Sequence, residues 1–288
     1  MNKSKKLCIK IPLSTANLAC GFDTFGLALN LYNTYTFEKA ESYKLIGFKR
    51  EYTNNNNLCL TSYKETLNML KVEDIPVSIT LDQHIYNCGG LGSSANVIIA
   101  GVTAALYMVK GSVNKDEVLE IASKIEGHPD NVAAEVYGGL TSAVKVDSDY
   151  KIFKYDVNDE LVFNLFIPSF SLSTKQMRAC LPKEVSMEDA IYNLSRAANL
   201  PYALKFGNLS DIALLMKDKL HQAYRIDKIK GAKEVFEYAE DKALPHAISG
   251  SGASLLIVAK EDIKEEFDGF INCSLKADNE GMKIYEEN

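Results

Sequence analysis

The stretch Asn87–Gly101, NCGGLGSSANVIIAG, places three glycines and two serines directly before a long apolar run. A glycine-rich turn at the start of a helix lets backbone N–H groups approach an anion, which the positive end of the helix dipole also attracts. The same residue types also occur in a turn that caps a helix, here Ala95–Val109, and holds no ligand. The stretch alone leaves both interpretations open.

Two well-known phosphate loops fit this stretch less well. The Walker-type loop needs a lysine after its last glycine, and none stands there. The dinucleotide fingerprint matches as Gly90-x-Gly92-x-x-Ala95, but it requires a strand just before it and an acidic residue ending a second strand about 20 residues later. The corresponding region, VKGSVNKDEVLE, has the pattern of one helix ending and another beginning. The Walker loop is therefore excluded and the dinucleotide loop is disfavoured.

Strand and helix patterns surround this loop on both sides. Alternating apolar residues predict strands at 7–14, 31–40 and 76–85, and the apolar run predicts a central helix covered on several sides. Residues 147–159 are polar and predict an exposed hairpin or a domain junction. The other expected elements are helices at 115–126, 186–207 and 210–225, a turn with a short helix and a strand at 128–144, and strands at 161–169 and 246–260.

Composition limits the class of protein. The chain has 288 residues, 47% of them hydrophobic, which allows one large or two ordinary domains. Its net charge of −6 argues against a nucleic-acid partner, since such proteins carry a basic face. The longest apolar run is shorter than the ~20 residues of a membrane span, and the start, MNKSKKLCIKIPLS, lacks the apolar core of a signal peptide. No membrane partner is expected.

The six cysteines are scattered, without CxxC pairs or zinc-ligand spacing. This usage is typical of buried thiols in a reducing, cytoplasmic compartment.

Two further polar motifs are candidates for small-molecule binding. PLSTANLACGFDTFGLALNLYN places Asn17 and Asp23 among glycines, where they could hold a polyol or an amino group, or only shape a turn. IEGHPDNVAAEVYGGL contains Glu126, and one such carboxylate suffices for magnesium when phosphate oxygens supply other ligands. The alternative for that motif is a helix end, a proline turn and a capping residue.

Basic residues and a second glycine loop follow. SLSTKQMRACLP contains Thr174, Lys175 and Arg178, and DKLHQAYR carries Asp218, His221, Gln222 and Arg225 at helical spacing on one expected face. Two arginines could bind a substrate carboxylate, because the guanidinium group pairs bidentately with carboxylates; a solvated surface charge is the alternative for either one. ISGSGAS, between two apolar strands, could close over a ligand or form a hairpin.

In this order, the motifs resemble those of the GHMP small-molecule kinases. PLSTANLACGFDTFGLALNLYN, GGLGSSAN and ISGSGAS are similar to the three family motifs and spread over nearly the whole chain. EGHPDNVA, STKQMRACLP, DAIYNLSRAA and DKLHQAYR resemble the homoserine kinases within that family. The resemblance implies transfer of the γ-phosphoryl group of ATP, with Mg²⁺, to the side-chain hydroxyl of L-homoserine, giving O-phospho-L-homoserine for threonine biosynthesis.

The implied fold is α+β, with two domains. Residues 1–155 would form an ATP-binding domain like ribosomal protein S5 domain 2, and residues 156–288 a ferredoxin-like domain. A homodimer is compatible with the resemblance. The alternatives are another GHMP kinase with a mevalonate-type acceptor, or a non-catalytic ligand sensor of the same fold. The presence of Ser93, Ser94 and Glu126 argues against the sensor.

The resemblance also implies which residues form the nucleotide side of the site. The phosphates of ATP would lie on Gly89, Gly90, Leu91, Gly92, Ser93, Ser94 and Ala95. One serine, in first place Ser93, would bind Mg²⁺ together with Glu126. Asn57, in TNNNNLCL, resembles the residue on the adenine side.

On the acceptor side, Asn17 and Asp23 would hold the substrate, with Asp23 pairing with its amino group. Arg178 and Arg225 would bind the substrate carboxylate, and Thr174 would lie beside the reacting hydroxyl. The remaining implied site residues are His128, Asp130, Asn131, Gly250 and Gly252.

The sequence departs from the family pattern at several positions: Ala19 and Cys20 precede Gly21-Phe22-Asp23 where the motif usually reads GPGFD, and Tyr86 and Asn96 replace a usual proline and alanine. At the position where some members carry an aspartate base, this chain has Asn131, with Asp130 beside it. We therefore expect no strong dedicated base: Asn131 or Thr174 would orient the hydroxyl, and its proton would leave late.

Overall fold

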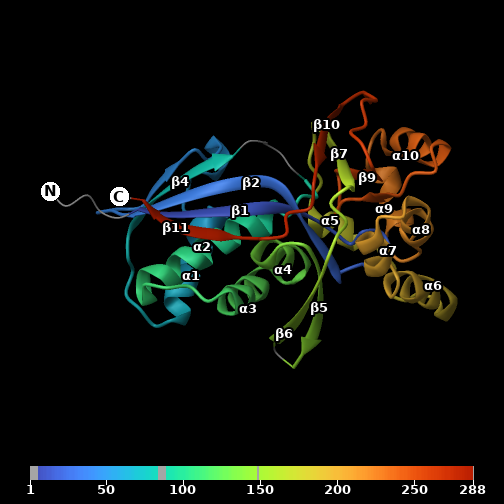
Figure 1. Cartoon of the computed structure of the whole chain (residues 1–288). Helices are drawn as coiled ribbons and strands as arrows, with labels where there is room; N and C mark the ends of the chain where they lie inside the picture. Colours follow the sequence, from blue (N-terminus) through green and yellow to red (C-terminus); the bar gives the residue numbers. More distant parts are fainter. Residues whose placement is uncertain (1–5, 84–88, 148, 288) are drawn as a thin grey trace.

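The computed structural model describes residues 6–83, 89–147 and 149–287, which form two lobes lying side by side (Figure 1). Tyr86 and Cys88 lie outside the described residues. The first lobe contains the strands β1 (Lys6–Ala16), β2 (Phe25–Lys39), β3 (Lys44–Ile46), β4 (Val77–Gln83), β5 (Leu140–Val146), β6 (Asp149–Tyr155) and β11 (Lys283–Glu287). Its α-helices are α1 (Leu58–Met69), α2 (Ser93–Lys110), α3 (Lys115–Glu126) and α4 (Asp130–Tyr137).

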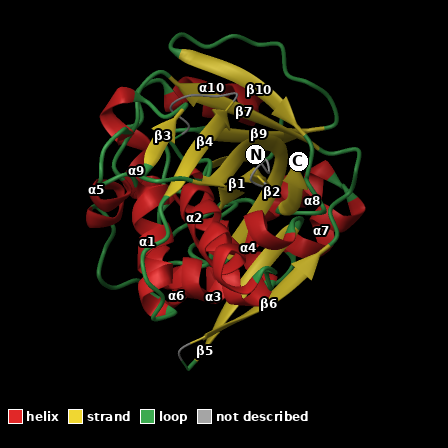
Figure 2. Ribbon diagram, turned by 90° about the vertical axis from the view of Figure 1, so that its left-hand side faces the viewer, coloured by secondary structure: helices red, strands yellow, loops and turns green. Residues whose placement is uncertain are grey.

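The sheet of the first lobe is mixed and is covered by helices on one face. Its strands run in the order β11-β1-β2-β4-β3, and β5 pairs with the first part of β2 and with β6. Along β4 and over residues 33–37 of β2 every second residue is buried, as expected for a sheet with one solvated face. Helices α1–α4 gather on one side of these strands (Figure 2). The strands predicted at 7–14, 31–40 and 76–85 are confirmed as parts of β1, β2 and β4 for the described residues.

Helix α2 is the central helix of this lobe. It starts after Gly92 and ends before Gly111, both in the left-handed conformation. Its length and apolar composition would suit a membrane span, yet 61% of it is buried inside the protein. The predicted central helix is thus confirmed as a core element.

The second lobe has an antiparallel sheet in the order β10-β7-β9-β8. Its strands are β7 (Val162–Pro168), β8 (His246–Ile248), β9 (Leu255–Ala259) and β10 (Phe270–Leu275). Its helices are α5 (Thr174–Ala179), α6 (Met187–Ala197), α7 (Leu200–Phe206), α8 (Leu209–Leu215), α9 (Gln222–Arg225) and α10 (Ala232–Asp241). Alternate residues of β7 face two different cores, so β7 is buried on both sides.

The two lobes are joined by more than one connection. One core cluster combines Leu27 and Leu140 of the first lobe with Phe163 and Leu204 of the second. After β10 the chain returns, and β11 pairs antiparallel with β1. A division at residue 155 therefore separates β11 from its own sheet.

The helix predicted over 210–225 is wrong as a single element, because α8 ends at Leu215 and α9 begins at Gln222. The Asp218 carboxylate accepts the backbone N–H groups of Leu220, His221 and Gln222 at 3.0, 2.8 and 2.7 Å. Aspartate competes in this way with helical hydrogen bonds, so Asp218 caps α9 instead of lying on a helix face.

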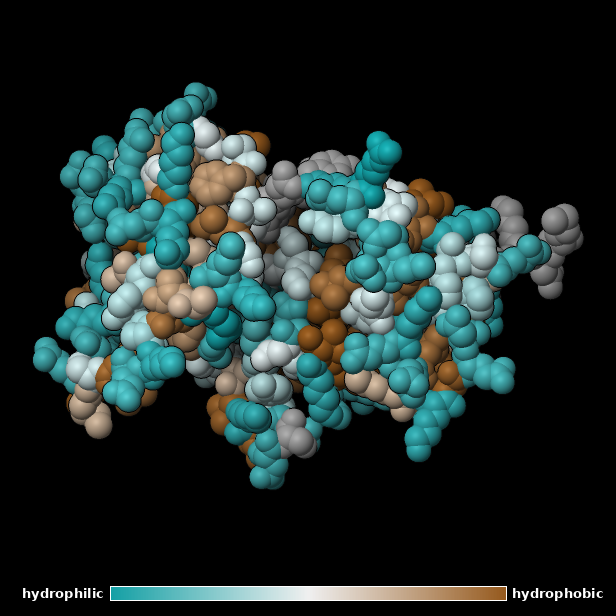
Figure 3. Space-filling model, turned by 180° about the vertical axis from the view of Figure 1, so that it is seen from behind, coloured by the Kyte–Doolittle hydropathy of each residue, from teal (hydrophilic) through white to brown (hydrophobic). Residues whose placement is uncertain are grey.

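The surface of the protein seen from behind is mostly hydrophilic, as the composition suggests (Figure 3).

Candidate active site

Two adjoining cavities, of about 340 and 330 Å³, lie at the N-terminus of α2. They share a wall made of Tyr52, Gly89, Ser93 and Ser94. The first cavity, here called the nucleotide cavity, is closed by apolar groups and amides, among them Leu13, Asn33, Asn57, Leu81 and Val97. The second, here called the acceptor cavity, contains most of the charged candidates: Asp23, Glu126, His128, Asp130, Arg178 and Arg225.

The glycine loop 89–92 is held from two sides. The Leu91 carbonyl accepts the Ser14 N–H of β1 at 3.3 Å. The hydroxyls of Ser249 and Ser254 donate to the carbonyls of Gly90 and Gly89, each at 2.6 Å. The loop, the first strand and the segment ISGSGAS therefore form one unit, although they are far apart in sequence. With its carbonyls turned to the protein, the loop leaves the start of α2 open to an anion.

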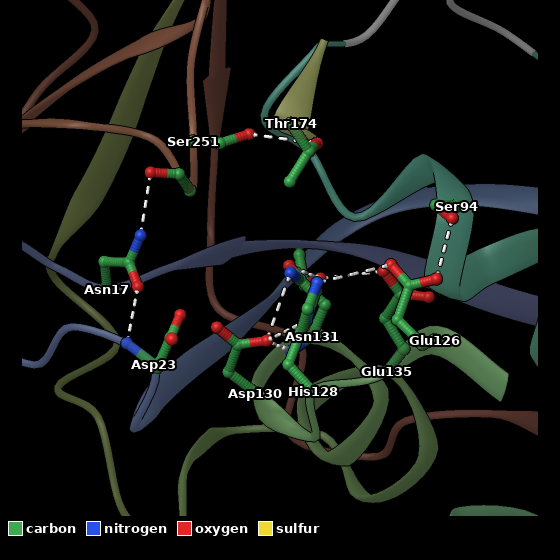
Figure 4. Close-up of polar contacts among 12 residues, drawn as sticks. Asn17, Asp23, Ser94, Glu126, His128, Asp130, Asn131, Glu135, Thr174 and Ser251 are labelled. Atoms are coloured by element: carbon green, nitrogen blue, oxygen red, sulfur yellow. Dashed lines mark hydrogen bonds and ion pairs between the residues drawn. The ribbon is translucent and has the colours of Figure 1, made fainter. Parts of the chain in front are cut away.

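The first polar motif forms an unusual left-handed turn. Asn17, Leu18 and Ala19 all have positive φ, at 71°, 41° and 61°. Left-handed backbone disfavours residues with a Cβ by roughly 1–2 kcal/mol each, so other contacts must hold the turn. The Asn17 amide donates to the Gly250 carbonyl at 2.7 Å and its carbonyl oxygen accepts the Asp23 N–H at 2.9 Å. This turn directs Asp23 into the acceptor cavity (Figure 4).

Asp23 and Arg178 form a bidentate ion pair across the acceptor cavity. Both guanidinium nitrogens donate to the carboxylate at 2.7 Å, although the two residues are 155 positions apart. This hydrogen bonding raises the pKa of Arg178 above its ordinary value. About 40% of the Arg178 side chain and 34% of the Asp23 side chain remain exposed, so a ligand from the cavity can reach both partners.

Arg225 is the most deeply buried cation of the acceptor cavity, with only 1% of its surface exposed. Its guanidinium donates to the Met177 carbonyl at 3.2 Å, to His221 Nδ1 at 3.1 Å and to the Gly250 carbonyl at 3.4 Å. Among the described residues no carboxylate forms an ion pair with it. Burial lowers the pKa of Arg225. A ligand carboxylate would supply the charge that its partners lack.

His221 orients Arg225. Its Nδ1 accepts from Arg225, so Nε2 carries the hydrogen and donates to the Ala19 carbonyl at 2.8 Å. Burial lowers the pKa of His221, in agreement with this neutral tautomer. His221 thereby joins Arg225 to the left-handed turn.

Glu126 and Ser94 form a group of oxygen atoms beside the glycine loop. The Ser94 hydroxyl donates to Glu126 Oε2 at 2.7 Å, and burial raises the pKa of Glu126 (Figure 4). The described residues contain no group of three or more His, Cys, Asp or Glu that could hold a metal ion. One carboxylate, one hydroxyl and phosphate oxygens still suit magnesium, which keeps few protein ligands. The structure brings Ser94 into contact with Glu126, and Ser93, the residue preferred from the sequence, lines the same cavity.

The start of α4 presents His128, Asp130 and Asn131 to the same cavity. Asp130 Oδ1 accepts from His128 Nδ1 at 2.9 Å and from the Asn131 N–H at 2.8 Å. The hydrogen bond that His128 donates to Asp130 raises the pKa of His128. The Asp130 carboxylate thus already accepts hydrogen bonds from two neighbouring residues.

Comparisons with known proteins agree with this geometry. Residues 57–139 match the family described as GHMP kinases N terminal domain. The chain is 35% identical to a homoserine kinase of Clostridium kluyveri over 273 residues, which cover 91% of this chain and 89% of that protein. The chain belongs to the homoserine kinases of the GHMP family. A homoserine kinase of Clostridium beijerinckii is also 35% identical, over 88% of this chain and 87% of the relative.

The fold is shared with solved members of the GHMP family. A crystal structure described as homoserine kinase from Cytophaga hutchinsonii superposes with a TM-score of 0.83 at 23% identity, covering 99% of this chain and 98% of that one. This likeness agrees with the α+β GHMP kinase fold expected from the sequence.

The site residues implied by the family resemblance differ in their burial and in the cavity that they line. Leu91 and Ala95 are fully buried in the cores, so only their backbone could take part in binding. Asn57 lines the nucleotide cavity, caps α1 through the Leu60 N–H and donates to the Tyr52 carbonyl at 2.9 Å. Sequence reasoning did not single out other lining residues: Asn33, Ser171 and Ser251, which lie within the quoted motifs, and Lys49 and Tyr52, which lie outside them.

Proposed function

We propose that this chain transfers the γ-phosphoryl group of ATP to the side-chain hydroxyl of L-homoserine, giving O-phospho-L-homoserine and ADP. The observation that carries the proposal is the acceptor cavity, in which the Asp23 carboxylate and two arginines line the same space as the start of α2. This set complements a zwitterionic amino acid. A mevalonate-type acceptor has no amino group to pair with Asp23.

The acceptor would replace the Asp23–Arg178 ion pair with contacts of its own. Its ammonium group would pair with Asp23, and its carboxylate would lie between Arg178 and Arg225. Since each charge of the pair regains an opposite charge from the substrate, opening it leaves neither group unpaired. Asn17 would hold Asp23 in place, and Thr174, whose hydroxyl lies 3.3 Å from the Ser251 hydroxyl, would lie beside the reacting group.

ATP would place its base in the nucleotide cavity near Asn57 and its phosphates on residues 89–95. The positive end of the α2 helix dipole favours negative charge there. Mg²⁺ would be held by Glu126 with Ser94 or Ser93 and would neutralise charge on the phosphates when bound. Gly250 and Gly252 would allow the ISGSGAS segment to approach the substrate.

In the reaction, the homoserine hydroxyl oxygen forms a bond to the γ-phosphorus while the bond to the ADP oxygen breaks. The transition state of such transfers is loose, so positioning and charge stabilisation contribute most. Asn131 or Thr174 would orient the hydroxyl. Its proton would leave late, to an oxygen of the transferred phosphoryl group, without a dedicated base.

Replacing Asp130 with asparagine tests the absence of a base. We expect kcat to fall by no more than about tenfold, because asparagine can still accept the Asn131 N–H that Asp130 accepts now. Steady-state kinetics with L-homoserine and ATP give the comparison, and the Michaelis constant for homoserine reports whether binding is kept. A fall of several orders of magnitude in kcat with unchanged binding would instead identify Asp130 as the base.

The function itself is tested by coupled detection of ADP with purified protein. We expect ADP formation with L-homoserine, and none with mevalonate or without an acceptor. Chelation of divalent ions should abolish turnover and added Mg²⁺ should restore it. ADP formation with mevalonate alone would favour the other GHMP acceptor, whereas ATP binding without turnover on either acceptor would favour a sensor.

The proposal extends to assembly and location. An exposed apolar row on α6, formed by Met187, Ile191 and Leu194, supports a homodimer, which sedimentation of the whole chain would test. The mostly hydrophilic face in Figure 3 supports the proposed cytoplasmic location.

A further inference from the structure

A buried glutamate lies behind the acceptor cavity and is not explained by the proposed site residues. Glu135, on α4, is fully buried. Its Oε1 lies 2.7 Å from the Ser14 hydroxyl, which also lies 2.9 Å from Asn131 Oδ1. Its Oε2 lies 3.1 Å from the side-chain nitrogen of Asn96. Ser14 therefore lies between Glu135 and Asn131, the residue proposed to orient the hydroxyl.

The orientation of Asn96 is fixed by its other partners. Its nitrogen also donates to the Pro12 carbonyl at 3.0 Å, and its oxygen accepts from the Tyr35 hydroxyl at 2.9 Å and from Asn33 at 3.0 Å. Both hydrogens and both acceptor sites of the amide are thus occupied. Since Asn96 donates to Oε2, that oxygen of Glu135 is an acceptor.

The number of hydrogens available to Ser14 decides whether Glu135 is protonated. A hydroxyl carries one hydrogen, but here it faces two oxygens, Glu135 Oε1 and Asn131 Oδ1. The nitrogen of Asn131 faces the Asp130 carboxylate, at 3.4 Å, so the amide oxygen is the atom that faces Ser14. In this orientation an ionised Glu135 would leave one of the two oxygen pairs without a hydrogen between its atoms. With a hydrogen on Oε1, Glu135 donates to Ser14 and Ser14 donates to Asn131, so every contact is satisfied.

We propose that Glu135, in its protonated form, is a positioning residue that fixes the side-chain amide of Asn131 through Ser14. This inference rests on the proposed function, in which Asn131 orients the acceptor hydroxyl. With Oδ1 of Asn131 held by Ser14, its NH₂ group faces Asp130, 3.4 Å from the carboxylate, and is available to the hydroxyl oxygen of the acceptor. Deprotonation of Glu135 would take the Ser14 hydrogen and release this orientation.

The surroundings of Glu135 favour the neutral form. Burial raises the pKa of Glu135 well above its ordinary value, and the charges of Glu126 on α3 and Asp130 on α4 act in the same direction. The titratable group on β2 that faces the network, Tyr35, has its pKa raised by burial and stays neutral as well. The groups that contact Glu135 from β1 and α2, Ser14 and Asn96, carry no charge.

Four variants separate this role from a merely structural one. We expect Glu135→Gln to keep kcat near that of the wild type at neutral pH, because glutamine supplies both the acceptor for Asn96 and a donor for Ser14. Ser14→Ala should lower kcat by about tenfold with little change in the Michaelis constant for homoserine, since Asn131 loses its donor. Glu135→Ala should lower kcat less than Ser14→Ala, and adding it to Ser14→Ala should have no further effect on kcat, because Glu135 acts through Ser14.

The pH profile and the spectra of the protein complete the test. The kcat of the wild type should fall at alkaline pH as Glu135 loses its proton, and Glu135→Gln should lack this fall. In the protein without ligands, the infrared band of a protonated carboxylic acid should disappear in Glu135→Gln, and an alkaline titration of the side-chain amide resonances of Asn131 should be seen only in the wild type. These two readouts need no turnover, so they decide the inference even if homoserine is not the acceptor. An equal loss of kcat in Glu135→Gln and Glu135→Ala, or no lost infrared band, would overturn it.

Discussion

Replacing Arg225 with methionine is expected to lower kcat/KM for L-homoserine by about a hundredfold, the size of the effect when one partner of a buried charge pair is removed. Most of the change should appear in the Michaelis constant for homoserine, and the constant for ATP should change little. The reason is that Arg225 is buried and donates hydrogen bonds only to neutral acceptors, so its charge is available to the substrate carboxylate.

Methionine is chosen because it keeps the length and apolar body of the side chain. Arg225→Met removes a buried charge that lacks a carboxylate partner, but it also leaves the Met177 carbonyl and His221 Nδ1 without their donor, so thermal unfolding is measured alongside the kinetics. Arg196→Met is the matched control, because Arg196 lies on α6 and stacks over the Tyr192 ring, away from both cavities. Unchanged homoserine kinetics in Arg225→Met would mean that Arg225 does not bind the substrate.

The second large effect is expected at Gly92, the residue before α2. In Gly92→Ala the new Cβ would lie 2.1 Å from Glu135 Oε1 and 2.3 Å from the Ser14 hydroxyl, and φ is +69°. Both neighbours are held by hydrogen bonds, so the loop must shift. Left-handed backbone and overpacking together should lower the free energy of unfolding by roughly 2–5 kcal/mol and weaken ATP binding.

The other end of α2 supplies the control for this substitution. Gly111 has a similar φ of +71°, but a Cβ there would meet no atom within 4 Å. Gly111→Ala should therefore show only the backbone penalty, about 1–2 kcal/mol, and normal ATP affinity. Denaturant unfolding and ATP titration of both variants make the comparison. Equal effects at the two glycines would mean that contacts with Glu135 and Ser14 contribute nothing.

Local rules predict the parts of the site that lie within one element. The glycines and serines before α2 and the strand alternation of β1, β2 and β4 follow from turn chemistry and periodicity, and the structure confirms these elements. Helix α10, in contrast, was not predicted, and the helix expected over 210–225 is interrupted by the capping carboxylate of Asp218.

Contacts between distant segments could not be predicted in this way. Nothing in DKLHQAYR indicates that Arg225 is buried, because its burial depends on the left-handed turn at Ala19 and on Gly250. Glu135 has the sequence context of an ordinary residue of a short helix. Its role depends on Asn96 and Ser14, which approach it only after α2 and β1 pack against α4.

The return of the chain from the second lobe to the first has a consequence for synthesis on the ribosome. β1 emerges before the second lobe, but its partner β11 follows the whole of that lobe. Until residues 283–287 emerge, one edge of β1 offers unpaired backbone groups, which invite association with other nascent chains. The first lobe therefore completes its sheet only after translation of the second, and a ribosome that stalls within the second lobe leaves that edge open.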